Sequence, residues 1–546
     1  MSSTVSSPRT NVLPTSAPTG ESPRRRLRAV LALARFEAHE LLLQIPVFVV
    51  LCAYVASTGW ELWTGGGEDG AYPVLQDADR ATQPVPLILG VAVLVCVNRA
   101  VLRSRRRGTD RHFDVLVMEP WRRTVAHLLS VVPFALATAL VVAAQFAGAA
   151  LRPGALGTGS FFELAVAPLA VLLFGVLGVL IARLIPSAFG APLFVVGIYV
   201  AVAMLTSNPE DPHWLRWLAP VVDEGQSEPL PSDLLGRPAA WHALYLVGLI
   251  ALVSCAAVLR GGRRTLPAAL GLARAGRTPV TGPVEGPVEG RMRLVKAVAL
   301  GAAVLTLAGA VGQSPGDSPA LLAARKQASV APEKDHTCVP HGRSTYCAFP
   351  EWTGRTEDWA AVVRRVQSLA GGAAGGTKLT VRQRIDARYG LSASSSLEPS
   401  GTHGQVTVGT LWGGNRVPEF SIGVASVLVA GDEEAAAAMC DGRVVTVMWL
   451  ALATTSDPMA SLRDVRIDDS VSGSAVVLAP TEPLAMTAAQ TTVVRELLQR
   501  PRYGVTAKVK AHWTELTAPK TSTARAAELL DVPVPRGSEK EDKCEE

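Results

Sequence analysis

The segment FFELAVAPLAVLLFGVLGVLIA (residues 161–182) contains a single charged residue, Glu163, in a stretch long enough to cross a membrane. A membrane-spanning helix needs about 20 mostly apolar residues, because the hydrocarbon layer is roughly 30 Å thick. We find seven such runs and expect each to span: 42–60, 85–102, 126–150, 161–182, 189–206, 239–259 and 294–312. The last run is rich in Ala and Gly, so a buried helix of a soluble domain is the alternative for it.

The composition agrees with a membrane protein. Of the 546 residues, 49% are hydrophobic and 18% are charged, and the mean hydropathy is +0.27. A soluble globular chain carries about 25% charged residues. These values exclude an average soluble enzyme and a disordered protein.

The distribution of arginine and lysine predicts the orientation of the chain. Segments 24–40, 103–123 and 260–296 are rich in basic residues, whereas 61–84 and 208–238 are acidic. Loops rich in Lys and Arg stay in the cytoplasm. We therefore expect a multi-pass protein of the cell membrane with a cytoplasmic N-terminus, and seven spans then place the C-terminal segment outside the cell.

These patterns divide the chain into six parts, which together predict an α-helical polytopic membrane protein with an extracytoplasmic α+β domain. Residues 24–41 are predicted to form a basic amphipathic helix in the headgroup layer, although a simple extension of the first span is the alternative. The parts are a disordered N-terminus (1–23), the amphipathic helix (24–41), a six-span domain (42–260), a Gly/Pro/Arg-rich cytoplasmic linker (261–293), a seventh span (294–313) and the α+β domain (314–546).

The C-terminal segment has the composition of a folded domain. LTVRQRI (379–385) and QVTVG (405–409) alternate like strands. We interpret FSIGVASVLVAG (420–431) as a buried strand, because it is a continuous apolar run. Thr487 and Gln490 have the spacing of a capping box at the start of a helix.

Motifs for catalysis and nucleotide binding are missing from the sequence. There is no G-x-x-x-x-G-K-[ST] phosphate-binding loop, no H-E-x-x-H and no G-x-S-x-G. We therefore expect neither an enzyme nor a cofactor bound by this chain. We also expect no nucleic-acid partner.

Cys338 and Cys347 lie in a segment that also contains His336 and His341. A metal site is one interpretation of this cluster. A disulfide is the favoured one, because the segment is predicted to lie in an oxidising compartment. Cys440 and Cys544 can pair as well, and the sequence leaves that question open.

Polar residues inside membrane spans often mark a transport path. Asn98, Gln145 and Glu163 are the candidates in this chain. Each of them can instead direct its polar end to a membrane interface.

The stretch RSRRRGTDRHFDVLVMEPWRRTVAHLLS (103–130) contains a short apolar segment between two basic ones. A helix here would lie along the membrane surface and dock into the groove of a partner. The alternative is a solvated basic loop held by anionic lipid.

Four features together resemble the permease subunit of ATP-binding-cassette transporters of the type-2 exporter family. They are the leading amphipathic helix, the long first loop, the pattern D-x-L-x-x-x-P-x-x-R (114–123) and the aromatic loop DPHWLRWLAP (211–220). The resemblance covers about 24–260 and does not include the seventh run or the C-terminal domain. The element F-P-E-W (349–352) and the high Ala, Gly and Arg content resemble actinobacterial proteins of this class.

The resemblance implies a separate ATPase subunit, which would bind ATP and Mg and contact the loop between the second and third spans. The contact residues would be Asp114, Leu116, Met118, Glu119, Arg122 and Arg123. It also implies export of an amphipathic or hydrophobic compound by a homodimer or heterodimer of permeases embedded in lipid. The alternative is a membrane-anchored sensor or binding protein that does not transport, and a membrane-bound hydrolase is disfavoured by the missing motifs.

Overall fold

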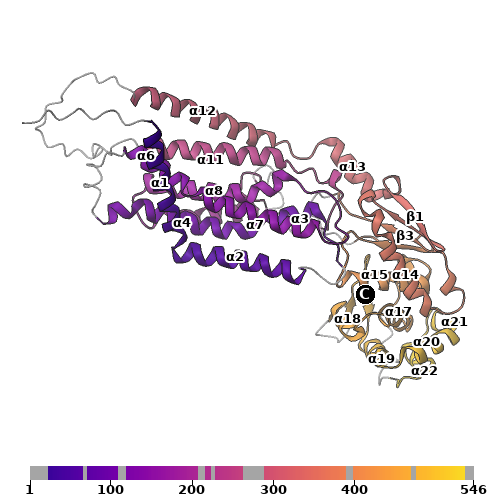
Figure 1. The fold of residues 1–546 in the computed structure, drawn as a ribbon. Helices are drawn as coiled ribbons and strands as arrows, with labels where there is room; N and C mark the ends of the chain where they lie inside the picture. The colour runs from indigo at the N-terminus through magenta and orange to yellow at the C-terminus, as the bar shows by residue number, and fades with distance from the viewer. Residues whose placement is uncertain are drawn as a thin grey trace, which may run out of the picture.

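The computed structural model describes residues 23–65, 71–107, 119–206, 216–222, 228–261, 288–388, 397–468 and 475–534. A bundle of long helices carries a C-terminal domain (residues 314–534) at one end (Figure 1). Within the described residues, six helical stretches are long and apolar enough to cross a membrane, as a polytopic helical membrane protein requires. They are Ile45–Thr64, Leu75–Ser104, Pro120–Ala150, Phe161–Leu184, Ala239–Arg260 and Met292–Gly312.

The predicted span over 189–206 is shorter than the others. It forms α9 (Gly190–Thr206), whose 17 residues cover only about 25 Å at 1.5 Å per residue. It therefore falls short of a full span by length. Gly190 lies beside Ile185, just after α8 (Phe161–Leu184), whereas Trp217 packs on Arg80 at the opposite end of the bundle. The chain thus still changes ends between Gly190 and Trp217.

Helix α8 is the centre of the bundle and packs against three others: α4 (Pro84–Arg106), α7 (Val132–Ala150) and α11 (Ala239–Gly261). Gly178 permits the close contact with α4, because a Cβ there would lie 2.5 Å from the carbonyl oxygen of Leu94. Small residues allow membrane helices to approach in this way. Helices α2 (Ile45–Thr64) and α12 (Val288–Gly312) lie on opposite sides of the bundle (Figure 1).

The end of the bundle away from the C-terminal domain is the arginine-rich end. Here α1 (Pro23–Leu42) runs across the bundle and packs on α6 (Pro120–Leu129) through a small cluster around Val30 and Ala34 (Figure 1). Gln44 has an extended backbone and separates α1 from α2. The helix expected over 24–41 is thus a separate element and no extension of the first span.

The other end of the bundle, the domain-facing end, contacts the C-terminal domain. It is built from α3 (Leu75–Ala81), the loop from α7 to α8, and a segment that includes the 3-10 helix η1 (Ser232–Leu234). Side chains of these segments, such as Tyr72 and Leu156, belong to the hydrophobic core of the C-terminal domain. The bundle and the domain therefore share one core at this end.

The C-terminal domain contains two sheets among its described residues. The first has the order β1-β2-β3-β4, in which β1 and β2 are antiparallel and the two other pairs are parallel. The second is antiparallel with the order β5-β6-β7. The strands are β1 (Thr337–His341), β2 (Ser344–Ala348), β3 (Thr380–Gln383), β4 (Gln405–Val408), β5 (Arg466–Asp468), β6 (Ala475–Val477) and β7 (Leu484–Met486).

Helices surround these sheets. The α-helices are α13 (Pro319–Val330), α14 (Thr356–Leu369), α15 (Arg416–Ala430), α16 (Glu433–Ala437), α17 (Arg443–Leu452), α18 (Pro458–Asp464), α19 (Ala488–Leu498), α20 (Arg502–Ala511), α21 (Trp513–Leu516) and α22 (Thr523–Leu529). The 3-10 helices are η2 (Pro332–Lys334), η3 (Pro350–Arg355) and η4 (Ala374–Gly376). The capping box expected at Thr487 and Gln490 is present at the start of α19.

The strand expected over 420–431 is wrong, because this stretch lies in α15. Nearly every residue of α15 is buried, from Pro418 to Val429. A helix that is covered on all sides has no polar face, so its sequence lacks the helical period and resembles a buried strand.

Candidate functional site

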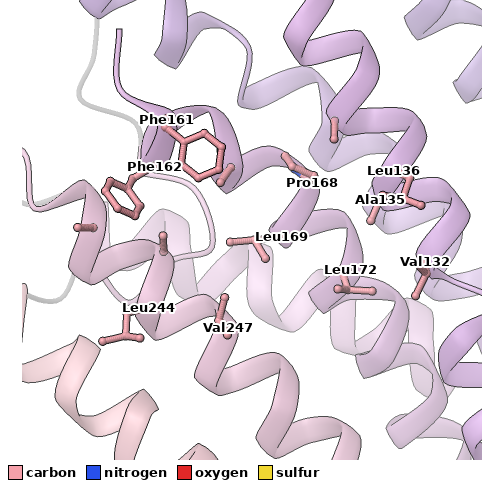
Figure 2. Close-up of a pocket in the computed structure, with 14 residues that line it drawn as sticks. Val132, Ala135, Leu136, Phe161, Phe162, Pro168, Leu169, Leu172, Leu244 and Val247 are labelled. Atoms are coloured by element: carbon pink, nitrogen blue, oxygen red, sulfur yellow. The ribbon is translucent and has the colours of Figure 1, made fainter.

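An apolar groove lies among α7, α8 and α11 (Figure 2). Its volume is about 520 Å³. Between Phe161 and Leu172, α8 lines it over roughly 16 Å, at 1.5 Å per residue. The lining residues are Val132, Ala135, Leu136, Ala139, Phe161, Phe162, Ala165, Pro168, Leu169, Leu172, Ala240, Ala243, Leu244 and Val247.

Small side chains create the groove. Three alanines, Ala135, Ala165 and Ala243, face it from the three helices, and Pro168 lies inside α8. Phe161 and Phe162 flank one end (Figure 2), and Phe161 is largely exposed whereas Phe162 is about half exposed. Every lining side chain is hydrocarbon, so the groove can hold an apolar molecule but offers no side chain for acid–base or nucleophilic chemistry.

The three residues expected along a transport path do not line this groove. The carboxylate of Glu163 accepts a hydrogen bond from Nε2 of Gln83 at 2.8 Å and lies 3.5 Å from Nε of Arg80. Gln145 accepts a hydrogen bond from the Tyr54 hydroxyl at 3.3 Å.

Asn98 lies at a third position, at the contact between α4 and α8. It donates a hydrogen bond to the carbonyl oxygen of Gly178 at 3.4 Å, where α4 and α8 approach each other. Each candidate thus joins one pair of neighbouring elements, and the structure does not bring the three together.

Half of the predicted ATPase contact lies outside the described residues, namely Asp114, Leu116 and Met118. Glu119 precedes α6 and accepts hydrogen bonds or ion pairs from Trp121 and from Arg122, the latter at 3.3 Å. The Arg122 guanidinium also stacks over the Trp121 ring at 5.3 Å. Arg123 lies on the same first turn of α6.

A partly buried polar cluster of Arg103, Glu37, Glu40 and His127, called the arginine-rich junction here, connects α1, α4 and α6. Arg103 of α4 donates to Glu37 at 2.8 Å and to Glu40 at 3.2 Å, both on α1. Nδ1 of His127 on α6 lies 3.9 Å from the Glu37 carboxylate. Burial raises the pKa of Glu37, and Arg103 opposes that shift. This junction was not predicted from the sequence, although Glu37 and Glu40 are the acidic residues among the arginines of the leading helix.

A second polar contact, the Glu351 latch, joins the C-terminal domain to the bundle. The Glu351 carboxylate accepts hydrogen bonds from the backbone N–H of Ser232 at 3.1 Å and from Nε2 of Gln76 at 3.0 Å. Nε2 of Gln76 also donates to the carbonyl oxygen of Leu230 at 2.9 Å. The adjacent Trp352 is fully buried and donates to the carbonyl oxygen of Thr410 at 3.1 Å. The F-P-E-W element therefore fixes the domain to the bundle.

Aromatic and arginine side chains extend the same contact. The ring of Tyr72 stacks on Trp412 with centroids 6.4 Å apart, and Arg355 lies over Tyr72 at 5.5 Å. Arg325 is almost completely buried and donates to the carbonyl oxygens of Leu234 and Leu235 at 2.8 and 2.7 Å. Two separate segments of the bundle, one around Tyr72 and Gln76 and one around Ser232 and Leu234, are thus held by the domain.

Cys338 and Cys347 face each other across β1 and β2 and form a disulfide, as predicted. The neighbouring histidines take other roles. His336 packs edge-on against Phe349 at 4.7 Å, and Nε2 of His341 lies 2.9 Å from the Thr356 hydroxyl. In the described part of the chain, no group of three or more His, Cys, Asp or Glu residues is arranged to hold a metal ion.

Cys440 is disulfide-bonded, whereas Cys544 lies outside the described residues. Cys52, Cys96 and Cys255 are free thiols.

The chain was compared with known proteins. No family model, no curated protein and no solved structure matches it.

Proposed function

We propose that this chain is the membrane-spanning permease subunit of an ATP-binding-cassette transporter and exports an amphipathic or hydrophobic compound. A separate ATPase subunit would bind ATP and Mg and contact the segment between α4 and α6. This chain would itself bind no cofactor, and two permeases, identical or different, would form the transporter.

The observation that carries this proposal is the arginine-rich junction. The segment between α4 and α6 is bounded by two helices that both pack on α1. Helix α4 is held there by the ion pair of Arg103 with Glu37, and α6 by the apolar cluster around Val30 and Ala34. Because α7 follows α6 directly, a push on that segment would move the start of α7 together with the junction. Helix α7 forms one wall of the apolar groove, so the same movement would change the width of the groove.

The orientation is also part of the proposal. Basic loops favour a cytoplasmic arginine-rich end. The disulfide between Cys338 and Cys347 supports an extracytoplasmic C-terminal domain, because disulfides persist in oxidising compartments. Labelling of single substituted cysteines at positions 280 and 400 in intact cells tests this. Labelling at 280 together with protection at 400 would show that the chain has the opposite orientation.

The test of the function is the Leu116→Asp variant. A charge at an apolar contact costs at least as much as the roughly 1.5–3 kcal/mol gained by burying a leucine. We expect weaker co-purification of the ATPase subunit, or ATP hydrolysis uncoupled from transport, with unchanged membrane insertion. Arg105→Ala is the control and should have a much smaller effect. Equal ATPase recovery and equal transport for Leu116→Asp and the unmodified chain would refute the proposal.

One observation favours a second function, a membrane-anchored sensor without transport. The Glu351 latch and the shared core would carry a change in the C-terminal domain directly to α3 and to the segment around η1. An ATPase that neither co-purifies with the chain nor responds to it would favour this alternative.

A further inference from the structure

A basic pocket lies at the arginine-rich end, where α2 begins and α4 ends. Its volume is about 260 Å³. It is lined by Gln44, Arg99, Ala100, Arg103, Arg106 and Arg107. Four guanidinium groups thus converge on one small concavity that is separate from the apolar groove.

The carboxylates near this pocket do not neutralise it. Glu37 and Glu40 both pair with the same residue, Arg103. Arg99, Arg106 and Arg107 have no acidic partner among the residues that the structure describes. The pocket therefore has a net positive charge, and it suits an anion that can accept several N–H donors.

The position of the pocket identifies the source of such an anion. Arg99 lies inside the membrane-spanning stretch Leu75–Ser104 and is exposed on its surface. Arginine side chains at this depth direct their charged ends to the headgroup layer. Beside the pocket, Leu43, Ile45 and Phe48 expose 61%, 77% and 52% of their surface. A charged pocket with an apolar flank matches both halves of a lipid molecule.

We propose that this pocket binds the phosphate of an anionic phospholipid from the leaflet at the arginine-rich end. The planar guanidinium group matches phosphate geometry and donates two parallel hydrogen bonds to it. Basic pockets between membrane helices bind anionic headgroups in this way. The lipid would join Gln44 of the α1–α2 connection to α4, directly beside Arg103. The proposal is independent of the transport function.

The test compares two doubly substituted full-length chains. Arg99→Gln with Arg106→Gln removes two charges from the pocket, and Arg24→Gln with Arg25→Gln removes two exposed charges from α1. The control keeps the total charge equal, so a general attraction between a basic protein and an anionic lipid does not distinguish the variants. Each purified protein is titrated in mixed micelles with dioleoyl phosphatidylglycerol or with the corresponding phosphatidylcholine, and bound lipid is counted by native mass spectrometry.

We expect the unmodified chain and the α1 control to retain phosphatidylglycerol in preference to phosphatidylcholine. The pocket variant should bind phosphatidylglycerol about 30-fold more weakly, since each of the two arginines removed contributes about 1 kcal/mol and about 1.4 kcal/mol is a tenfold change in affinity. Equal phosphatidylglycerol binding by the two variants would overturn the proposal. Competition by inorganic phosphate at equal concentration would also overturn it, because the site would then serve a soluble anion. If the double pocket variant does not fold, the single Arg106→Gln variant is compared with the single Arg24→Gln variant, which again keeps the total charge equal.

Discussion

Replacement of Glu351 by alanine should loosen the C-terminal domain from the bundle. The substitution removes two hydrogen bonds to a carboxylate, one from the backbone of Ser232 and one from Gln76. A hydrogen bond to a charged group contributes about 1.5–3 kcal/mol. Gln76 keeps its second acceptor, the carbonyl oxygen of Leu230, so the loss of its bond counts only in part. The expected loss in the free energy of unfolding is therefore about 2–4 kcal/mol.

Thermal unfolding followed by tryptophan fluorescence measures this loss, because Trp352 and Trp412 lie in the shared core. For a unit of about 200 residues, 2–4 kcal/mol corresponds to a Tm lower by roughly 5–12 °C. The matched control is Glu357→Ala, which removes an exposed carboxylate from the first turn of α14 and should change the stability by about 0.5 kcal/mol or less. Equal Tm values for the two variants would refute the claim that Glu351 stabilises the contact between the C-terminal domain and the bundle.

Three further predictions follow from single contacts. Replacement of Cys338 and Cys347 by serine should lower the free energy of unfolding by about 2–3 kcal/mol. Mass mapping of the unreduced native protein tests the pairing, and two free thiols at these positions would contradict it. Gly178→Ala should lower the free energy of unfolding by about 1–3 kcal/mol, because the new Cβ meets the backbone of Leu94. The control Gly301→Ala has open space around the new Cβ and should leave the Tm unchanged or raise it. Burial lowers the pKa of His336 from 6.5 to about 4, so its contribution to stability is full above pH 6.5 and is lost as the pH falls toward 4. His336→Phe should weaken the fall in Tm between pH 7 and pH 5, and an unchanged fall would remove His336 as its cause.

The apolar runs predicted the long helices well because the membrane imposes a minimum length of continuous hydrophobicity. A continuous apolar run does not reveal which side of the helix packs against its neighbours. Helix α8 is apolar on all sides, so its sequence does not distinguish Leu172, which lines the groove, from Leu173, which is buried against α11. The groove is made by α7 and α8, which are consecutive, and by α11, which is distant from them in the sequence, so only the packing of the three helices reveals it.

The error at α15 has the same physical origin. Its run of Val, Ile, Ser and Ala carries no period, and its length of 15 residues was the one available sign of a helix. The Glu351 latch had a clearer signal. An acid between Pro350 and Trp352, in an otherwise aromatic and apolar element, indicates a buried acceptor, but its partners Gln76 and Ser232 lie far away along the chain.

The shared core has a consequence for how the protein is made. Tyr72, Leu156 and Leu230 leave the biosynthetic machinery long before Trp352 and Trp412, yet all five belong to one hydrophobic cluster. The C-terminal domain therefore cannot complete its core until the helices that precede it have been inserted and their loops have reached the same side of the membrane. A chain synthesised from residue 314 onward would lack those side chains and would present an open apolar surface to solvent. Folding of the C-terminal domain therefore depends on prior insertion of the helices that precede it.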